Sequence, residues 1–156
     1  MPSFHAIMSH VWHHLCPMPP IHAEDLKMAM QMAHLLSTRS RADRVHMGCV
    51  IINARTRNMV SQGYNHTIPH DESIMDDHGA PLLHVIHAED DALQKLPFWA
   101  TYACHALMTH APCLSCAQKM HHRGIHHVYY VHNYHDASGI TWLRSHGHEV
   151  KRLMLI

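Results

Sequence analysis

Three residues with the chemistry of metal ligands occur in two short motifs of the chain. His87 stands in the tripeptide His87-Ala88-Glu89, and Cys113 and Cys116 stand in the stretch "PCLSC". The two cysteines are separated by one helical turn, so at the start of a helix both sulfur atoms face the same side. A helix N-terminus favours the thiolate, which is the form that binds metal. The two motifs therefore predict one metal site.

The types of ligand residue indicate which metal ion would bind here and whether the ion is catalytic or structural. One histidine and two thiolates suit Zn²⁺ and leave the fourth tetrahedral position for water, as in catalytic zinc sites. Zinc supplies the acidity that makes water a nucleophile near neutral pH. Glu89 lies two residues after His87, and we expect it to serve as general base and then as general acid. This chemistry suits hydrolytic attack on a ring carbon that carries an exocyclic amino group.

The pentapeptide "IHAED" occurs twice, so the choice of His87 needs a reason. The first copy, residues 21–25, opens a predicted helix and places Glu24 and Asp25 in its first turn. Negative charge is favoured there by the helix dipole, which explains this copy without a metal. Its histidine, His22, begins a helix far from the cysteine motif in the sequence. We therefore assign His87 as the ligand.

Hydrophobic periodicity and turn residues predict the elements that must position these groups. We expect a helix over 21–36, followed by two strands over 47–53 and 59–65 that form a hairpin. From the second "IHAED" onward, helices are predicted over 87–95, 113–123 and 140–146, and strands over 104–109, 126–131 and 149–155. Gly124 and Gly147 are the expected helix ends. Strands that alternate with helices indicate an α/β fold with helices on both faces of the sheet.

The first 20 residues differ from the rest of the chain. Apolar residues between 4 and 15 follow helical spacing, and three prolines over 17–20 end the pattern. We interpret residues 1–20 as a helical extension and residues 21–156 as the zinc-binding domain. The apolar stripe of the extension suits packing on the domain itself or at an interface between copies of the chain.

Composition narrows the possible partners and the cellular setting. At 156 residues the chain is expected to form one main domain. Lys plus Arg and Asp plus Glu both number 12, so no basic field favours a nucleic acid as partner. Five cysteines, an odd number, and the lack of a secretory pattern at the N-terminus favour reduced thiols and a cytoplasmic protein. No segment is expected to enter a membrane.

Histidine is the unusual feature of the composition, with 22 residues. These histidines are spread along the chain, so we expect most of them to replace other polar residues on the surface. A histidine-rich metal buffer or pH sensor is the alternative. Cys16, Cys49 and Cys104 lie outside the two motifs and are expected to have no role in metal binding.

Longer stretches around the motifs resemble a known family. The combination H-x-E and P-C-x-x-C is the signature of zinc-dependent nucleobase deaminases. In addition, "MGCVII" followed by "GYN", and "THAPCLSCAQKMHHRGIHHVYYV", are similar to stretches of the deoxycytidylate (dCMP) deaminases. The resemblance covers roughly residues 24–154. It implies a three-layer α-β-α sandwich with a central mixed five-stranded sheet, one zinc ion per chain, and homo-oligomers that convert dCMP to dUMP and ammonia.

The resemblance also implies residues that bind the substrate. Asn65 would contact the nucleotide, and the amide of Ala88 would hold the pyrimidine carbonyl. Arg44 and Tyr134 would lie on the sugar-phosphate side. The simpler interpretations are a turn-forming asparagine for Asn65 and ordinary rim residues for Arg44 and Tyr134.

Other features of the sequence bear on the choice of substrate. Two positions depart from the family pattern, because His66 stands where glycine is frequent and Asp91 where asparagine is frequent. The alternatives are deamination of another base or nucleotide, such as modified dCMP, dCTP, cytidine or guanine, or a non-catalytic zinc module. Glu89 argues against the last of these, since a structural site closes with four ligands and needs no acid beside it.

Overall fold

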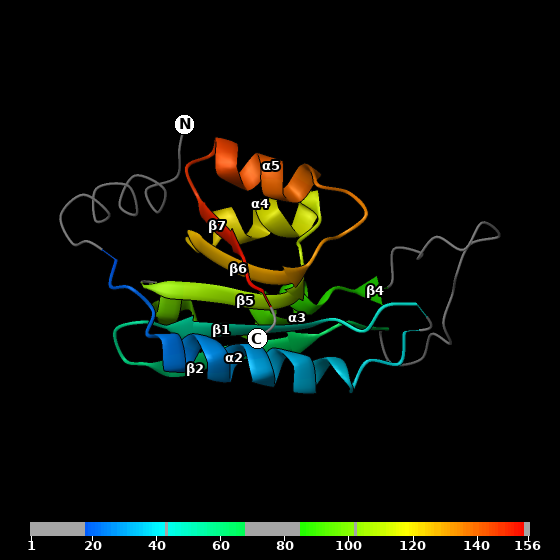
Figure 1. Ribbon diagram of the computed structural model, residues 1–156, viewed down its shortest axis with the longest axis horizontal. Coiled ribbons are helices and arrows are strands. Elements are labelled where there is room, and N and C mark those ends of the chain that lie inside the picture. Colours follow the sequence, from blue (N-terminus) through cyan, green and yellow to red (C-terminus); the bar gives the residue numbers. More distant parts are fainter. Residues whose placement is uncertain (1–17, 43, 68–84, 102, 155–156) are drawn as a thin grey trace.

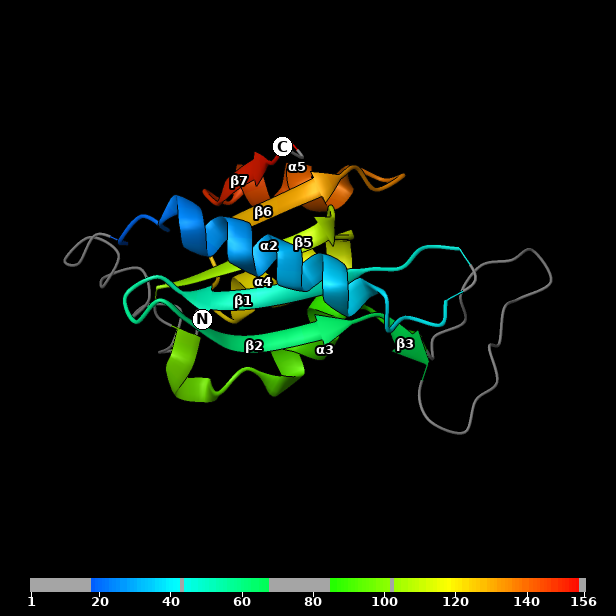
Figure 2. The ribbon, with the colours of Figure 1, turned by 60° about the horizontal axis from the view of Figure 1, so that its bottom comes forward.

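The computed structural model describes residues 18–42, 44–67, 85–101 and 103–154 (Figure 1). The helical extension predicted for residues 1–20 falls almost entirely outside these ranges, so it stays a prediction. The described residues form a sheet with helices on both faces (Figures 1 and 2).

The central sheet has five strands in the order β2-β1-β5-β6-β7. Its strands are β1 (Gly48–Asn53), β2 (Asn58–Tyr64), β5 (Cys104–His110), β6 (His127–His132) and β7 (Glu149–Arg152). β1 pairs antiparallel with β2 and with β5, whereas β5, β6 and β7 are parallel to one another. The sheet is therefore mixed, as expected. A separate two-stranded ladder joins β3 (His66–Thr67) to β4 (Val85–Ile86).

Alternation along the strands divides the core into two layers. On β1, Val50 and Ile52 pack beneath α2 (Ala23–Ser37), which presents Ala29, Ala33 and other small or apolar residues to the sheet. Cys49 and Ile51 point to the opposite face. That face is covered by α3 (Ala88–Lys95), α4 (Leu114–His122) and α5 (Ser138–Ser145). The three-layer α-β-α sandwich is thus confirmed.

Most predicted elements match the observed ones to within a few residues. The hairpin, the helices after the two motifs and the parallel strands all lie where periodicity placed them. Gly124 and Gly147 follow α4 and α5 with positive φ values of 74° and 79°, the conformation that glycine adopts at a helix end without strain. The sequence did not predict the short strands β3 and β4 or the 3₁₀ helix over Phe98–Thr101.

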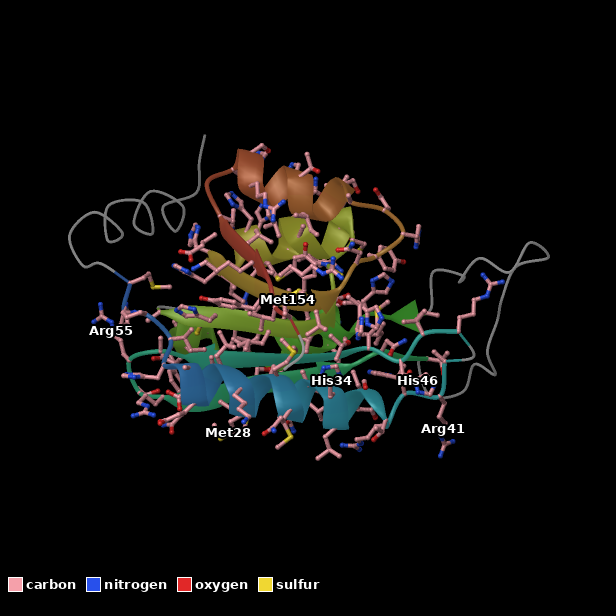
Figure 3. The ribbon with its side chains drawn as sticks, in the orientation of Figure 1. Met28, His34, Arg41, His46, Arg55 and Met154 are labelled. Atoms are coloured by element: carbon pink, nitrogen blue, oxygen red, sulfur yellow. The ribbon has the colours of Figure 1, made fainter. Side chains whose placement is uncertain are left out.

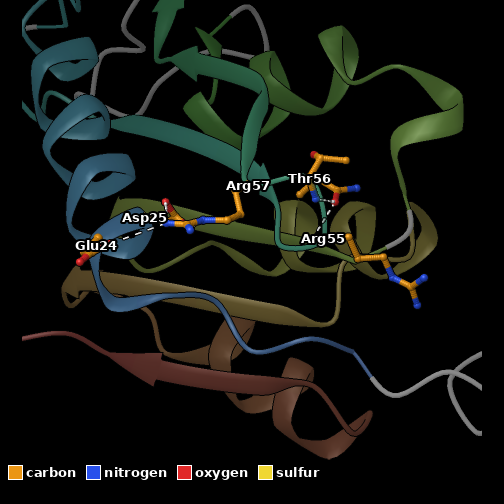
Figure 4. Close-up of polar contacts among 6 residues, drawn as sticks. Glu24, Asp25, Arg55, Thr56 and Arg57 are labelled. Carbon is orange, nitrogen blue, oxygen red and sulfur yellow. Dashed lines mark hydrogen bonds and ion pairs between the residues drawn. The ribbon is translucent and has the colours of Figure 1, made fainter.

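The first "IHAED" copy has a structural role that charge placement alone did not reveal. Arg57, in the turn between β1 and β2, donates from Nε to Asp25 Oδ2 at 2.7 Å and from Nη2 to Oδ1 at 3.1 Å. Glu24 lies further away, at 3.7 Å from the same guanidinium (Figure 4). This hydrogen bonding keeps the pKa of Asp25 below its ordinary value. The copy therefore fastens α2 to the hairpin turn rather than binding metal.

Gly63 lets α3 approach the sheet closely. A Cβ atom at this position would clash with the backbone of Ala88 and Ala92. We predict that Gly63→Ala destabilises the fold by about 1–3 kcal/mol, the usual cost of overpacking, as measured by urea unfolding. The neighbouring exposed residue provides the control: Gln62→Ala should change stability by less than about 0.5 kcal/mol. Equal stability of the two variants would show that α3 yields to the added methyl group.

Most histidines were expected on the surface, but some are buried in the fold. His105 and His148 are buried, and burial lowers the pKa of each to about 4. Stacking explains where these rings fit, because His105 lies 4.4 Å from His127 and His148 lies 4.8 Å from His126, centroid to centroid. Imidazoles that are neutral in the folded state thus fill space between the layers.

These two buried rings predict that the protein loses stability in mild acid. Their folded pKa values lie below the unfolded value of about 6.5, so their contribution is complete above that pH and declines as the pH falls toward 4. We expect the unfolding free energy of metal-free protein to drop by a few kcal/mol across this range. His105→Leu should flatten the decline. An equally steep decline in that variant would contradict the role of His105.

Candidate metal centre and catalytic site

The two motifs meet at the end of the molecule where β4, of the two-stranded ladder, and β5, of the central sheet, each lead into a helix. β4 ends at Ile86 immediately before His87, and β5 ends at His110, three residues before Cys113. His87 is the N-cap of α3, and Cys113 is the N-cap of α4, where its sulfur accepts from the backbone N–H of Cys116 at 3.5 Å. The starts of α3 and α4 therefore face each other, as predicted. The region around these two helix starts is called the site edge below.

The donor atoms of His87, Cys113 and Cys116 lie within 4.8 Å of one another. The Nδ1 atom of His87 is 3.5 Å from each of the two sulfur atoms. Tetrahedral zinc with ordinary bond lengths places nitrogen and sulfur ligands about 3.6 Å apart. Both nitrogen–sulfur distances thus match those of a zinc site. The three residues are the one group of at least three such side chains found within the described ranges.

The two thiols differ in their electrostatics. A hydrogen bond from Cys116, opposed by burial and supported by His87, lowers the pKa of Cys113 to about 4. The Cys113 thiolate and burial raise the pKa of Cys116. The Cys113 sulfur also raises the pKa of His87. The lowered pKa of Cys113 favours its thiolate, which is the state that metal binding requires.

Glu89 lies beside these donors in the first turn of α3. Its carboxyl group is buried, and its Oε2 atom has no hydrogen-bond partner among the described residues. Burial raises its pKa to about 7, so the group exchanges a proton readily near neutral pH. A buried carboxyl oxygen without a partner is costly in a site that is only structural, and this favours a role in binding or chemistry.

Asn65, predicted to contact the nucleotide, follows β2 at the same edge. Its Oδ1 atom accepts from the N–H of Met47 at 2.7 Å, and its Nδ2 atom donates to the carbonyl of Val45 at 2.8 Å. The side chain is buried and clamps the loop between α2 and β1. An amide retains a further N–H and a further lone pair, so contact with a ligand stays a proposal beside this structural role.

Ala88 and Tyr134 lie close to the metal donors. Ala88 is the buried first residue of α3, where backbone N–H groups point out of the helix start. Tyr134 follows β6 and packs against the core cluster beneath α3, α4 and α5. Burial, followed by the charges of Cys113 and Glu89, raises the pKa of Tyr134. Both residues are therefore near enough to the site to line it.

Arg44 lies in the loop between α2 and β1, and its side chain is exposed. The loop places two other exposed basic residues, Arg41 and His46, at the end of the molecule that carries β3 and β4 (Figures 2 and 3). Asn65 connects this loop to the site through Val45. The structure thus brings the Arg44 loop to the site edge, while contact of Arg44 with a substrate stays a proposal.

Two residues near the site were missed by sequence reasoning. Thr109, at the end of β5, accepts from the N–H of Gly48 through its Oγ1 atom at 3.1 Å and so holds β1 at the site edge. Asp91, on α3, accepts from the N–H of Tyr64 at the end of β2 and from Lys95 of its own helix. In the sequence, Asp91 stood out only as a departure from a family pattern. No local pattern shows that Asp91 and Tyr64, which are 27 positions apart, are neighbours.

An α-β-α sandwich with a His-Cys-Cys group at two helix starts is the arrangement expected of the zinc-binding deaminase family. Comparison with known families agrees: the profile described as "Cytidine and deoxycytidylate deaminase zinc-binding region" matches residues 23–132. The chain belongs to this family.

Individual relatives include deoxycytidylate deaminases. A Caenorhabditis elegans protein named "Probable deoxycytidylate deaminase" is 29% identical over 110 residues, which cover 67% of this chain and 55% of the worm protein. An "Uncharacterized deaminase in luxG 3'region" from Aliivibrio fischeri is 32% identical over 106 residues, covering 66% of this chain and 69% of that one. The chain thus spans only about half the length of the worm relative.

A solved structure is similar over most of the chain. The dCMP deaminase of cyanophage S-TIM5, crystallised in complex with dCMP and dUMP, superposes with a TM-score of 0.75 at 26% identity. The match covers 86% of this chain and all of the phage chain. Among the described residues, no helix combines the length and hydrophobicity needed to cross a bilayer.

Proposed function

We propose that this protein is a zinc-dependent dCMP deaminase that releases dUMP and ammonia. The single observation that carries the proposal is the buried carboxyl group of Glu89 beside the donors of His87, Cys113 and Cys116. The similarity to the phage dCMP deaminase along its whole length supports a mononucleotide as substrate.

In this proposal His87, Cys113 and Cys116 hold the zinc ion, and when bound the ion supplies the acidity that makes water a nucleophile. Glu89 accepts one proton from the attacking water and delivers it to the ring nitrogen as the C–O bond forms. It then accepts the second proton, from the new hydroxyl group, and delivers it to the amino group, which leaves when the C–N bond breaks. Its pKa of about 7 suits both directions of transfer. The result is loss of the exocyclic amino group as ammonia and its replacement by a carbonyl oxygen.

The remaining residues at the edge are proposed to hold the nucleotide. The N–H of Ala88, at the start of α3, is proposed to donate to the pyrimidine carbonyl. Tyr134 and Arg44 are proposed to lie on the sugar-phosphate side, and Asn65 to contact the nucleotide while it fixes the loop from Val45 to Met47. Assembly into homo-oligomers and a cytoplasmic location stay predictions.

The decisive experiment is a substrate panel with zinc-loaded protein. dCMP, dCTP, deoxycytidine, cytidine, 5-substituted dCMP and guanine are each incubated with the protein, and ammonia and the deaminated product are measured. We expect dCMP to give the highest kcat/KM, and metal removal by a chelator to abolish turnover until zinc is restored. Preference for another compound would replace dCMP in the proposal, and zinc binding without any turnover would favour a non-catalytic module.

A further inference from the structure

The carboxylate of Asp91 joins two parts of the site edge. Its Oδ2 atom accepts from the ammonium group of Lys95 at 2.7 Å and from the N–H of Tyr64 at 3.2 Å. Its Oδ1 atom lies 3.4 Å from Nε2 of His66. The side chain is only 8% exposed, and a carboxylate buried to this extent is stable only when its charge is matched. Lys95 supplies the matching charge at Oδ2, and the imidazole of His66 lies against Oδ1.

His66 is oriented toward Asp91 by a second contact. Its Nδ1 atom lies 3.0 Å from the carbonyl oxygen of Thr67. Nδ1 is therefore directed at the main chain and Nε2 at the Asp91 carboxylate. His66 also begins β3 and pairs through its backbone with Ile86, the residue before His87. The side chain of His66 thus contacts α3, and its backbone contacts β4, the strand that leads to His87.

Asn65 stands between the two residues that Asp91 holds, Tyr64 and His66. Glu89 lies half a turn before Asp91 on the same helix. We propose that Asp91 and His66 form a positioning pair, an inference that rests on the proposed function. The pair fixes the turn that carries Asn65 against the helix that carries Glu89, so it sets the width of the nucleotide site.

The pair should affect substrate binding more than the chemical step. The approach of α3 to β2 is maintained separately, because Ser61 donates from Oγ to the carbonyl of Ala92 at 2.5 Å and Gly63 packs on the backbone of α3. His87 and Glu89 therefore keep their places when Asp91 is neutralised, while the turn bearing Asn65 loses its anchor. A change in KM with little change in kcat is the signature of this role.

The test is a double-mutant cycle in the zinc-loaded protein with dCMP as substrate. Asp91→Asn keeps the size of the side chain and an oxygen for the Tyr64 N–H but removes the charge. We expect Asp91→Asn and His66→Asn each to raise KM about three- to tenfold, with kcat within about twofold, and the double variant to be no worse than either single variant. Asp90→Asn is the matched control, since Asp90 also pairs with a lysine at 2.7 Å, but this lysine is Lys119 of α4. It should leave KM unchanged.

Three results would overturn the positioning pair. They are unchanged KM values in both single variants, KM effects that multiply in the double variant, and a fall in kcat at constant KM. Urea unfolding of the same four proteins measures the coupling without substrate, and additive changes there would also contradict the pair. If the unaltered protein binds zinc but does not deaminate dCMP, the proposed function fails, and the unfolding cycle still decides whether His66 and Asp91 act together.

Discussion

Glu89→Gln is expected to lower kcat for deamination by about 10²–10⁴-fold, the range found when a general acid-base group is lost. Glutamine preserves the size of the side chain but neither accepts the proton of water nor donates one to the leaving group. Glu89 is buried beside the metal donors but is not one of them, so zinc content should stay near one ion per chain. Steady-state kinetics and metal analysis of the same preparations measure both quantities.

The neighbouring carboxylate provides the control for Glu89. Asp90→Asn removes a negative charge from the adjacent position of the same helix, where the carboxylate is partly exposed and pairs with Lys119. This variant should retain most of its activity. If Asp90→Asn were as inactive as Glu89→Gln, a general loss of negative charge at the start of α3 would explain both. If Glu89→Gln remained active, proton transfer by Glu89 would be excluded.

Cys113→Ala is expected to weaken zinc binding by more than about 100-fold, since loss of a direct ligand exceeds the 10–100-fold cost of losing an outer partner. The variant removes the thiolate that lies 3.5 Å from His87 and caps α4. Deamination should be lost together with the metal. The measurement is zinc affinity by competition with a chromophoric chelator, followed by activity at saturating zinc.

Cys104→Ala is the matched control, because Cys104 is also a cysteine of the β5–α4 region. It is buried in the sheet, its thiol donates to the carbonyl of Ala100, and burial raises its pKa to about 12. We therefore expect Cys104→Ala to bind zinc as the unaltered protein does. Loss of zinc from both variants would indicate that folding, rather than ligand chemistry, controls metal content. Normal zinc affinity in Cys113→Ala would exclude that residue as a ligand.

The sequence by itself determined most of the elements and the candidate metal donors. The spacing of Cys113 and Cys116 places both sulfur atoms on one side of a helix start, and this local property needs no tertiary information. Strand and helix periods likewise predicted the order of elements and, through their alternation, helices on both faces of the sheet. His87 was distinguished from His22 because each begins a different helix, which is again a local inference.

Only the tertiary structure decided which distant groups become neighbours. Asp25 and Arg57 are 32 positions apart and meet because α2 lies across the hairpin turn. His66 and Asp91 looked like separate departures from a family pattern, yet they lie 3.4 Å apart. Burial of His105, and of a Glu89 oxygen that has no partner among the described residues, also depends on how the layers pack. Spacing in the sequence defines contacts within a helix or strand, whereas contacts across layers depend on strand order and packing, which no local pattern contains.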